Sequence, residues 1–102
     1  MQRPRTVQEY VKLVDDTIIE LEELRDSAEY DMESSARDMA FVEPILQAVR
    51  NLRTNMGDGS YSFANEDLPF MTMITGRYAK IPCADMLVAI NTTHRKGLDV
   101  ED

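Results

Sequence analysis

The sequence predicts an all-α fold, in which a long antiparallel helical hairpin is followed by two shorter C-terminal helices, about four helices in total. Two observations lead to it. Apolar residues near the N-terminus recur at intervals of 4, 3, 4 and 3, which is the spacing of a helical seam. Seven methionines, no tryptophan and an aromatic content of 7% favour adaptable helix packing over an aromatic-rich β core. A chain of 102 residues has room for one domain, 1–102.

The first helix is predicted from about residue 6 to the high twenties. Thr6 and Glu9 have the spacing of a capping box, in which a hydroxyl caps the first turn and a carboxylate three residues later caps back. Tyr10 and Leu24 widen the apolar stripe. The stripe itself consists of Val7, Val11, Val14, Ile18 and Leu21.

The start of the second helix has two interpretations. Ser34 and Ser35 are N-cap residues for a helix that bends at Pro44. Alternatively, the first helix runs to about residue 41 and a shorter helix begins at Pro44. We prefer the first interpretation, because it gives a hairpin over 6–56 whose two helices have similar length and bury each other's seams. The predicted seam of the second helix consists of Met39, Val42, Ile45 or Leu46, Val49, Leu52 and Met56.

The rest of the chain divides into a connector, 57–66, a two-helix C-terminal unit, 67–98, and an acidic tail, 99–102. Gly57 to Gly59 end the hairpin. Asp67 and Pro69 mark the start of the third helix, whose apolar face includes Phe70 and Tyr78. Pro82 separates it from the last helix, and Gly97 ends that helix.

Charge and cysteine content restrict the functional class. The net charge of −8 disfavours nucleic acid and anionic membranes as partners, and residues 6–33 alone hold ten acidic and two basic residues. A single cysteine forms no internal disulfide, no membrane-spanning run is present, and the start of the chain lacks the apolar core of a signal peptide. We therefore expect a cytoplasmic protein without membrane insertion or nucleic-acid binding.

Chemically versatile residues are few. Cys83 lies on an apolar helix face, which indicates a small core residue rather than a nucleophile. His94 has no Cys or His near it in the sequence, and its place near a helix C-terminus is a structural explanation for it. A helix-turn-helix around 78–82 is disfavoured, because Pro82 begins its second helix where an apolar packing residue is needed. The sequence thus predicts no catalytic residue and no cofactor.

One enzymatic alternative comes from the acidic first helix. Asp16, Glu20 and Glu23 are spaced three and four apart and share a helix face, where carboxylates hold Mg²⁺ for phosphate chemistry, as in all-α nucleotide pyrophosphohydrolases. Those enzymes use acidic pairs on facing helices. The second helix offers only Asp38 and Glu43, five residues apart, so we expect the acids to be a solvent-facing surface instead.

Two stretches carry a resemblance to a known family. The first is Gly59-Ser60-Tyr61-Ser62-Phe63 with Glu66-Asp67-Leu68-Pro69-Phe70. The second is Ile81-Pro82 with Ile90-Asn91-Thr92-Thr93-His94-Arg95-Lys96-Gly97-Leu98. They resemble a family of proteobacterial proteins of about this length and of unknown function, some of which carry a general secretion pathway label. The resemblance covers most of the chain and implies no catalytic motif.

The leading functional hypothesis is a non-enzymatic protein-interaction module. We expect positions outside the strict seam to stay exposed on an isolated hairpin and to meet another helix. The predicted partner is a second copy, forming a homodimer through the first helix, or a foreign protein. In the alternative, the C-terminal helices cover those positions and the chain is a monomer. The predicted interaction surface consists of Tyr10, Ile19, Leu24, Tyr61, Phe63 and Met71.

Overall fold

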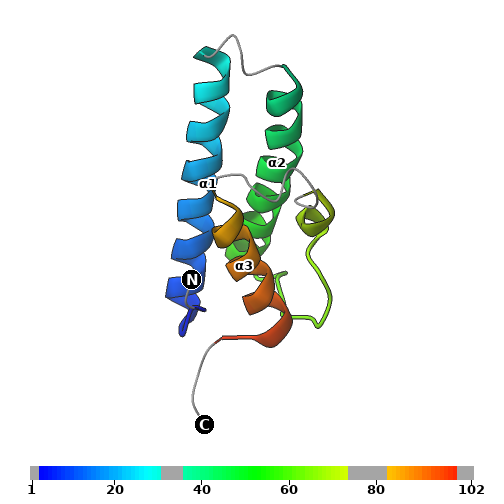
Figure 1. Cartoon of the computed structure of the whole chain (residues 1–102). Coiled ribbons are helices and arrows are strands. Elements are labelled where there is room, and N and C mark those ends of the chain that lie inside the picture. Colours follow the sequence, from blue (N-terminus) through cyan, green and yellow to red (C-terminus); the bar gives the residue numbers. More distant parts are fainter. Residues whose placement is uncertain (1–2, 31–35, 74–82, 99–102) are drawn as a thin grey trace.

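A computed structural model of the chain describes residues 3–30, 36–73 and 83–98. In this part of the chain all regular structure is helical, which confirms the predicted all-α class. Helices α1 and α2 form an antiparallel hairpin, and α3 lies beside the N-terminal half of α1 (Figure 1). The elements are α1 (Val7–Tyr30), α2 (Ala36–Asp58), the 3₁₀ helix η1 (Pro69–Met73) and α3 (Ala84–Lys96).

The first turn of α1 is capped by Thr6, as predicted. The backbone N–H of Glu9 donates to Thr6 Oγ1 at 3.1 Å. The carboxylate of Glu9 does not return to the Thr6 amide, however; its Oε1 accepts from the Arg5 N–H at 3.4 Å. The capping box is therefore displaced by one residue, and it fixes the N-terminal segment as well as the helix start.

Helix α2 begins at Ala36 and contains Pro44 in its interior, which agrees with the preferred of the two interpretations. The predicted caps Ser34 and Ser35 lie outside the described residues. The helix continues through Gly57 and ends at Asp58. Gly59 then takes a φ of +82°, in the left-handed region that glycine tolerates, and the amides of Ser60 and Tyr61 both donate to the Asn55 carbonyl at 3.1 Å.

The third predicted helix is wrong in its described part. Instead of an α-helix from residue 67, there is a 3₁₀ helix of five residues, η1. Leu68 and Phe70 are both buried, and two residues so spaced point to nearly opposite sides of an α-helix. Residues 74–82, including Tyr78 and Pro82, lie outside the described part. Three α-helices are thus described where about four helices were expected.

The buried stripe of α1 is offset from the predicted seam. Val14 and Leu21 are fully buried as predicted, whereas Val7 is 61% exposed and Ile18 is only partly buried. The fully buried positions are Tyr10, Val14, Thr17 and Leu21. They pack against the predicted seam of α2, which is buried at Val42, Ile45, Leu46, Val49 and Leu52. The side chain of Met39 lies outside the described part.

The offset arises because α1 packs against two helices. Side chains on one side of α1 form ion pairs with α2. On the other side, Tyr10 donates a hydrogen bond to the Ile90 carbonyl of α3 at 3.1 Å. The most buried direction therefore lies between α2 and α3. Thr17 occupies this direction despite its hydroxyl, because Oγ1 donates to the Leu13 carbonyl at 2.7 Å.

Arginines of α2 neutralise several acids of α1. Arg53 Nε lies 2.8 Å from Asp15 Oδ1, and Arg50 lies 3.6 Å from Glu22. In the opposite sense, Arg25 of α1 pairs with Glu43 at 3.2 Å. These ion pairs offset part of the acidic charge of α1 within one molecule. Among the described residues, no helix is long and apolar enough to cross a membrane.

The offset stripe makes a testable contrast between two neighbouring aliphatic residues of α1. Leu21→Ala removes a fully buried side chain and should lower the free energy of unfolding by about 2–5 kcal/mol. Ile19→Ala, at a position 52% exposed, should change it by less than about 1 kcal/mol. Urea denaturation followed by circular dichroism measures both. Equal losses for the two variants would show that α1 is oriented differently.

Candidate functional site

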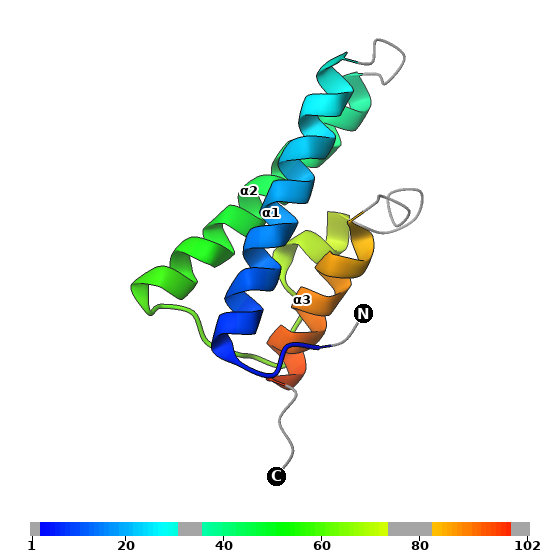
Figure 2. The same ribbon diagram turned by 90° about the vertical axis from the view of Figure 1, so that its left-hand side faces the viewer.

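Two hollows flank the N-terminal half of α1. One is an open groove on the side of the N-terminal segment, lined by charged and apolar residues. The other is an apolar pocket on the side of α2, where the N-terminal end of α1 and the C-terminal end of α2 diverge (Figure 2). They differ in what they offer a ligand.

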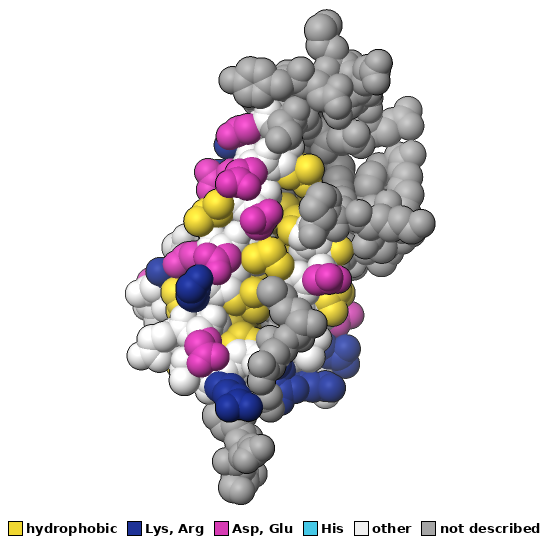
Figure 3. All heavy atoms as spheres, turned by 60° about the vertical axis from the view of Figure 1, so that its left-hand side comes forward, with side chains coloured by type: hydrophobic (Ala, Val, Ile, Leu, Met, Phe, Trp, Pro, Cys, Tyr) yellow, Lys and Arg dark blue, Asp and Glu magenta, His cyan; other side chains and the backbone are white. Residues whose placement is uncertain are grey.

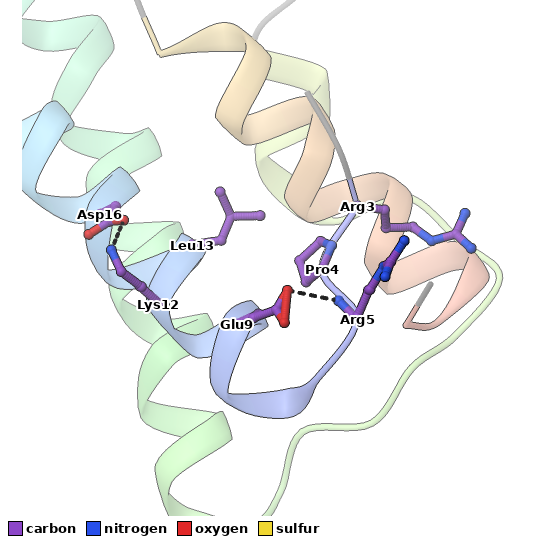
Figure 4. Close-up of a pocket in the computed structure, with 7 residues that line it drawn as sticks. All are labelled: Arg3, Pro4, Arg5, Glu9, Lys12, Leu13 and Asp16. Atoms are coloured by element: carbon purple, nitrogen blue, oxygen red, sulfur yellow. Dashed lines mark hydrogen bonds and ion pairs between the residues drawn. The ribbon is translucent and has the colours of Figure 1, made fainter. Parts of the chain in front are cut away.

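The groove has a volume of about 580 Å³ (Figure 4). Its charges are largely satisfied inside the molecule, since Lys12 Nζ lies 2.8 Å from Asp16 Oδ2 and Glu9 accepts from the Arg5 amide. The side chains of Arg3 and Arg5 point away from Lys12 and Asp16 (Figure 4). Both charge signs thus line the groove, and neither predominates enough to indicate a ligand class. The lining residues are Arg3, Pro4, Arg5, Glu9, Lys12, Leu13 and Asp16.

The apolar pocket has a volume of about 230 Å³ and no charged residue in its lining. Val7 and Phe63 are large hydrophobic residues at this pocket that stay exposed, by 61% and 44%. Three elements meet here, namely α1, α2 and the segment between α2 and η1. Because α2 includes Gly57 and Asp58, and η1 begins at Pro69, this connector spans residues 59–68 instead of the predicted 57–66. The lining residues are Val7, Tyr10, Val11, Met56, Tyr61, Ser62 and Phe63.

Three aromatic rings form the wall between this pocket and α3. Phe63 stacks on Tyr10 with ring centroids 5.9 Å apart and planes at 12°. Tyr61 meets both rings edge-on, at 5.9 Å from Tyr10 and 5.6 Å from Phe63. These are the offset and edge-to-face arrangements that the ring quadrupoles favour, so the three rings stabilise one another.

Behind the rings runs a chain of hydrogen bonds. The hydroxyl oxygens of Tyr10 and Tyr61 lie 2.9 Å apart, and Tyr61 Oη lies 2.8 Å from His94 Nδ1. Tyr10 Oη donates to the Ile90 carbonyl. Because the Tyr10 hydrogen is used there, Tyr10 Oη accepts from Tyr61. The single Tyr61 hydrogen is then used as well, so Tyr61 Oη must accept from His94 Nδ1–H.

This count of hydrogens assigns a tautomer to His94. Nδ1 carries a proton in the chain, and in the neutral ring Nε2 is then the unprotonated nitrogen. The chain of hydrogen bonds spans α1, the connector and α3. All three hydroxyl and imidazole groups are therefore satisfied away from the pocket, and the pocket side presents only ring faces, aliphatic groups and Ser62.

The connector is also held by other groups of α3. The Ala64 N–H donates to the His94 carbonyl at 3.1 Å, and the Leu68 N–H donates to Asn91 Oδ1 at 2.7 Å. Asn91 Nδ2 in turn donates to Asp67 Oδ1 at 3.0 Å. Asp67, predicted to cap the third helix, instead ties the connector to α3. The two stretches that carry the family resemblance meet at this attachment.

Burial shifts the pKa values of the groups in the chain. It raises the pKa of Tyr10 well above its usual range, with a further contribution from the Tyr61 hydrogen bond. It also raises the pKa of Tyr61. His94 is 7% exposed, and burial lowers its pKa, although Glu66 opposes the shift. At neutral pH the side chains of Tyr10, Tyr61 and His94 are therefore all uncharged.

The acidic residues of the enzymatic alternative do not converge with others. Asp16 pairs with Lys12, and Glu20 and Glu23 are exposed on the outer side of α1. Glu43 of α2 is occupied by Arg25, and the side chain of Asp38 lies outside the described part. In the described part of the chain, no three His, Cys, Asp or Glu residues are placed to hold a metal ion.

The predicted interaction residues do not form one surface. Tyr10 is 2% exposed, so its predicted exposure is wrong; α3 and the connector cover it. Leu24 is partly buried against the core, whereas Ile19 is exposed. Tyr10 and Ile19 are nine residues apart, which is about two and a half helical turns and places them on opposite sides of α1.

The C-terminal candidates separate in the same way. Tyr61 and Phe63 both line the apolar pocket, but Met71 packs against the core elsewhere. Cys83 is buried, and burial raises the pKa of its thiol, as expected for a core residue rather than a nucleophile. The sequence reasoning did not select Val7, Val11 and Met56 as site residues, because all three were assigned to hairpin seams. The residue that could have indicated the pocket was Val7, because its position in the first turn of α1 places it beyond the last turn that α2 covers.

Comparison of the chain with protein-family models, with curated proteins and with solved structures found no match. The resemblance to small proteobacterial proteins therefore stays a prediction.

The hydrogen-bond chain predicts a cost for removing one hydroxyl. Tyr61→Phe keeps the ring in the aromatic wall but leaves His94 Nδ1–H and Tyr10 Oη without their shared partner. The free energy of unfolding should fall by about 1–3 kcal/mol. Thr54→Val is the matched control, since it also removes one hydroxyl, which is exposed and donates only to the Arg50 carbonyl. Chemical denaturation compares the two, and a cost no larger than that of Thr54→Val would contradict the network.

The buried His94 predicts a pH dependence. Because its pKa is lower in the folded chain than its unfolded value of about 6.5, the unfolded state binds more protons below that pH. Stability is therefore fully present above about pH 6.5 and is lost as the pH falls through the folded pKa. His94→Asn, whose amide can replace Nδ1–H, should lose less stability between pH 7 and pH 5.5. Urea denaturation at pH 7 and at pH 5.5 measures the stability of both proteins, and parallel losses would exclude His94 as the cause.

Proposed function

We propose that this protein is a non-enzymatic interaction module that docks an apolar side chain of a partner protein in the pocket between α1, α2 and the connector. The observation that supports it is the coincidence, at one place, of an uncharged hollow of about 230 Å³ and two exposed large hydrophobic residues, Val7 and Phe63. In a chain with net charge −8, such a surface favours protein partners over ions or nucleic acid.

The chemistry of the wall supports an apolar occupant. Tyr10 and Tyr61 direct their hydroxyls into the internal hydrogen-bond chain, so they offer the pocket their ring surfaces. Asp15 and Arg53, which lie one turn from Val11 and Met56 respectively, neutralise each other at 2.8 Å. A leucine, methionine or phenylalanine side chain meets these demands, because it buries apolar area without leaving a polar group unpaired.

Peptides displayed on phage and selected against the full chain test the proposal. Selected peptides should share a large apolar residue, and their affinity should fall at least tenfold for Val7→Glu. This substitution is suited to the test because an acidic residue is stabilising in the first turn of a helix. Ile19→Glu is the matched control, since Ile19 is also more than half exposed on the same helix but lies outside the pocket.

Two results would contradict the proposal. One is a set of peptides that bind Val7→Glu as tightly as the native chain. The other is Mg²⁺-dependent hydrolysis of nucleoside triphosphates that is lost in Glu20→Gln, which would favour the enzymatic alternative built on Asp16, Glu20 and Glu23.

A further inference from the structure

We infer that the partner in this pocket is a second copy of the same chain, in a two-fold symmetric dimer in which Val7 of each copy enters the apolar pocket of the other. The inference rests on the proposed function, because it names the occupant of the same site. It is carried by the composition of the patch and by the charge on the outer face of α1.

The patch is self-complementary in its parts. A two-fold contact uses the same surface on both copies, so that surface must contain both a projecting group and a hollow to receive it. Val7, 61% exposed at the start of α1, is the projecting group, and the hollow bounded by Val11, Met56 and Phe63 adjoins it. Each copy thereby covers the exposed hydrophobic residues of the other. A thin core in a chain of 102 residues gains from such additional burial.

Charge disfavours a contact between two copies through the outer face of α1. Acidic side chains lie along the outer face of α1, with Lys and Arg gathered at the end of the molecule near the N-terminal segment (Figure 3). Pairing two copies through the region of Ile19 would bring Glu20 and Glu23 of one copy against those of the other, and like charges in such a contact are repulsive. The pocket has no charged residue in its lining, so two copies can meet there without this repulsion.

Sedimentation equilibrium across the micromolar concentration range tests the inference. The native chain should approach twice its monomer mass of 11.7 kDa with rising concentration. Val7→Glu places two like charges in the contact and should raise the dissociation constant at least tenfold, while Ile19→Glu should leave it unchanged. Because the contact contains no ion pair, raising the salt concentration should not weaken the native dimer. Salt should strengthen it instead, by screening the repulsion between two chains of net charge −8, and a dimer that salt weakens would contradict an uncharged contact.

Circular dichroism of both variants verifies that their helix content is native. A native chain that stays monomeric, or a dimer that Val7→Glu does not weaken, would overturn the inference. The peptide selection described above separates this failure from that of the proposed function. A monomer that binds apolar peptides at Val7 retains the interaction module and loses the self-partner, whereas a monomer that binds none loses both.

Discussion

The attachment of the connector to α3 is the constraint on which the site depends. Asn91 and His94 supply an amide and an imidazole in the interior. The Asn91 amide accepts from the Leu68 N–H and donates to Asp67, and the His94 imidazole is hydrogen-bonded to Tyr61. Without these bonds the backbone of the connector would lie against a helix with its own polar groups unpaired, which is costly in a buried place. The aromatic wall of the pocket is in turn carried by the connector, so the pocket exists only where α3 is docked.

The same constraint explains why the hairpin is not a simple two-helix coiled coil. α1 has to present Tyr10 toward α3 while keeping Val11 beside Met56 of α2, and its apolar surface is therefore wide. A wide stripe leaves residues at its end without a partner when the adjoining helix diverges. Val7 is in that position: α2 has already separated from α1, and α3 lies on the opposite side. The exposed patch is thus a consequence of one helix serving two neighbours.

Periodicity and punctuation residues predict the hairpin and the last helix, but they do not predict the 3₁₀ helix η1. The predictions from Thr6, Pro44 and Gly97 are confirmed where their effects are local: Thr6 caps α1, Pro44 lies inside α2, and Gly97 follows the last residue of α3 with a positive φ. The site could not be predicted in the same way, because its members come from residues 7–11, 56 and 61–63, and the divergence of two helices that brings them together is a tertiary effect. One error was avoidable. Tyr10 and Ile19 cannot share a helix face at any packing, and their spacing alone excludes a common surface.

Helix α3 has 13 residues, and helices of that length are marginal in water on their own. The helical state of α3 therefore depends on its docking against the connector and α1. The helix and its docked contacts should form and melt as one cooperative unit rather than in sequence. Backbone amides of α3 should exchange with solvent deuterium through the same opening event that separates Tyr61 from His94. The exchange rate of the slowest amides of α3 would therefore report how long the aromatic wall stays assembled, although the rings of that wall lie in other segments of the sequence.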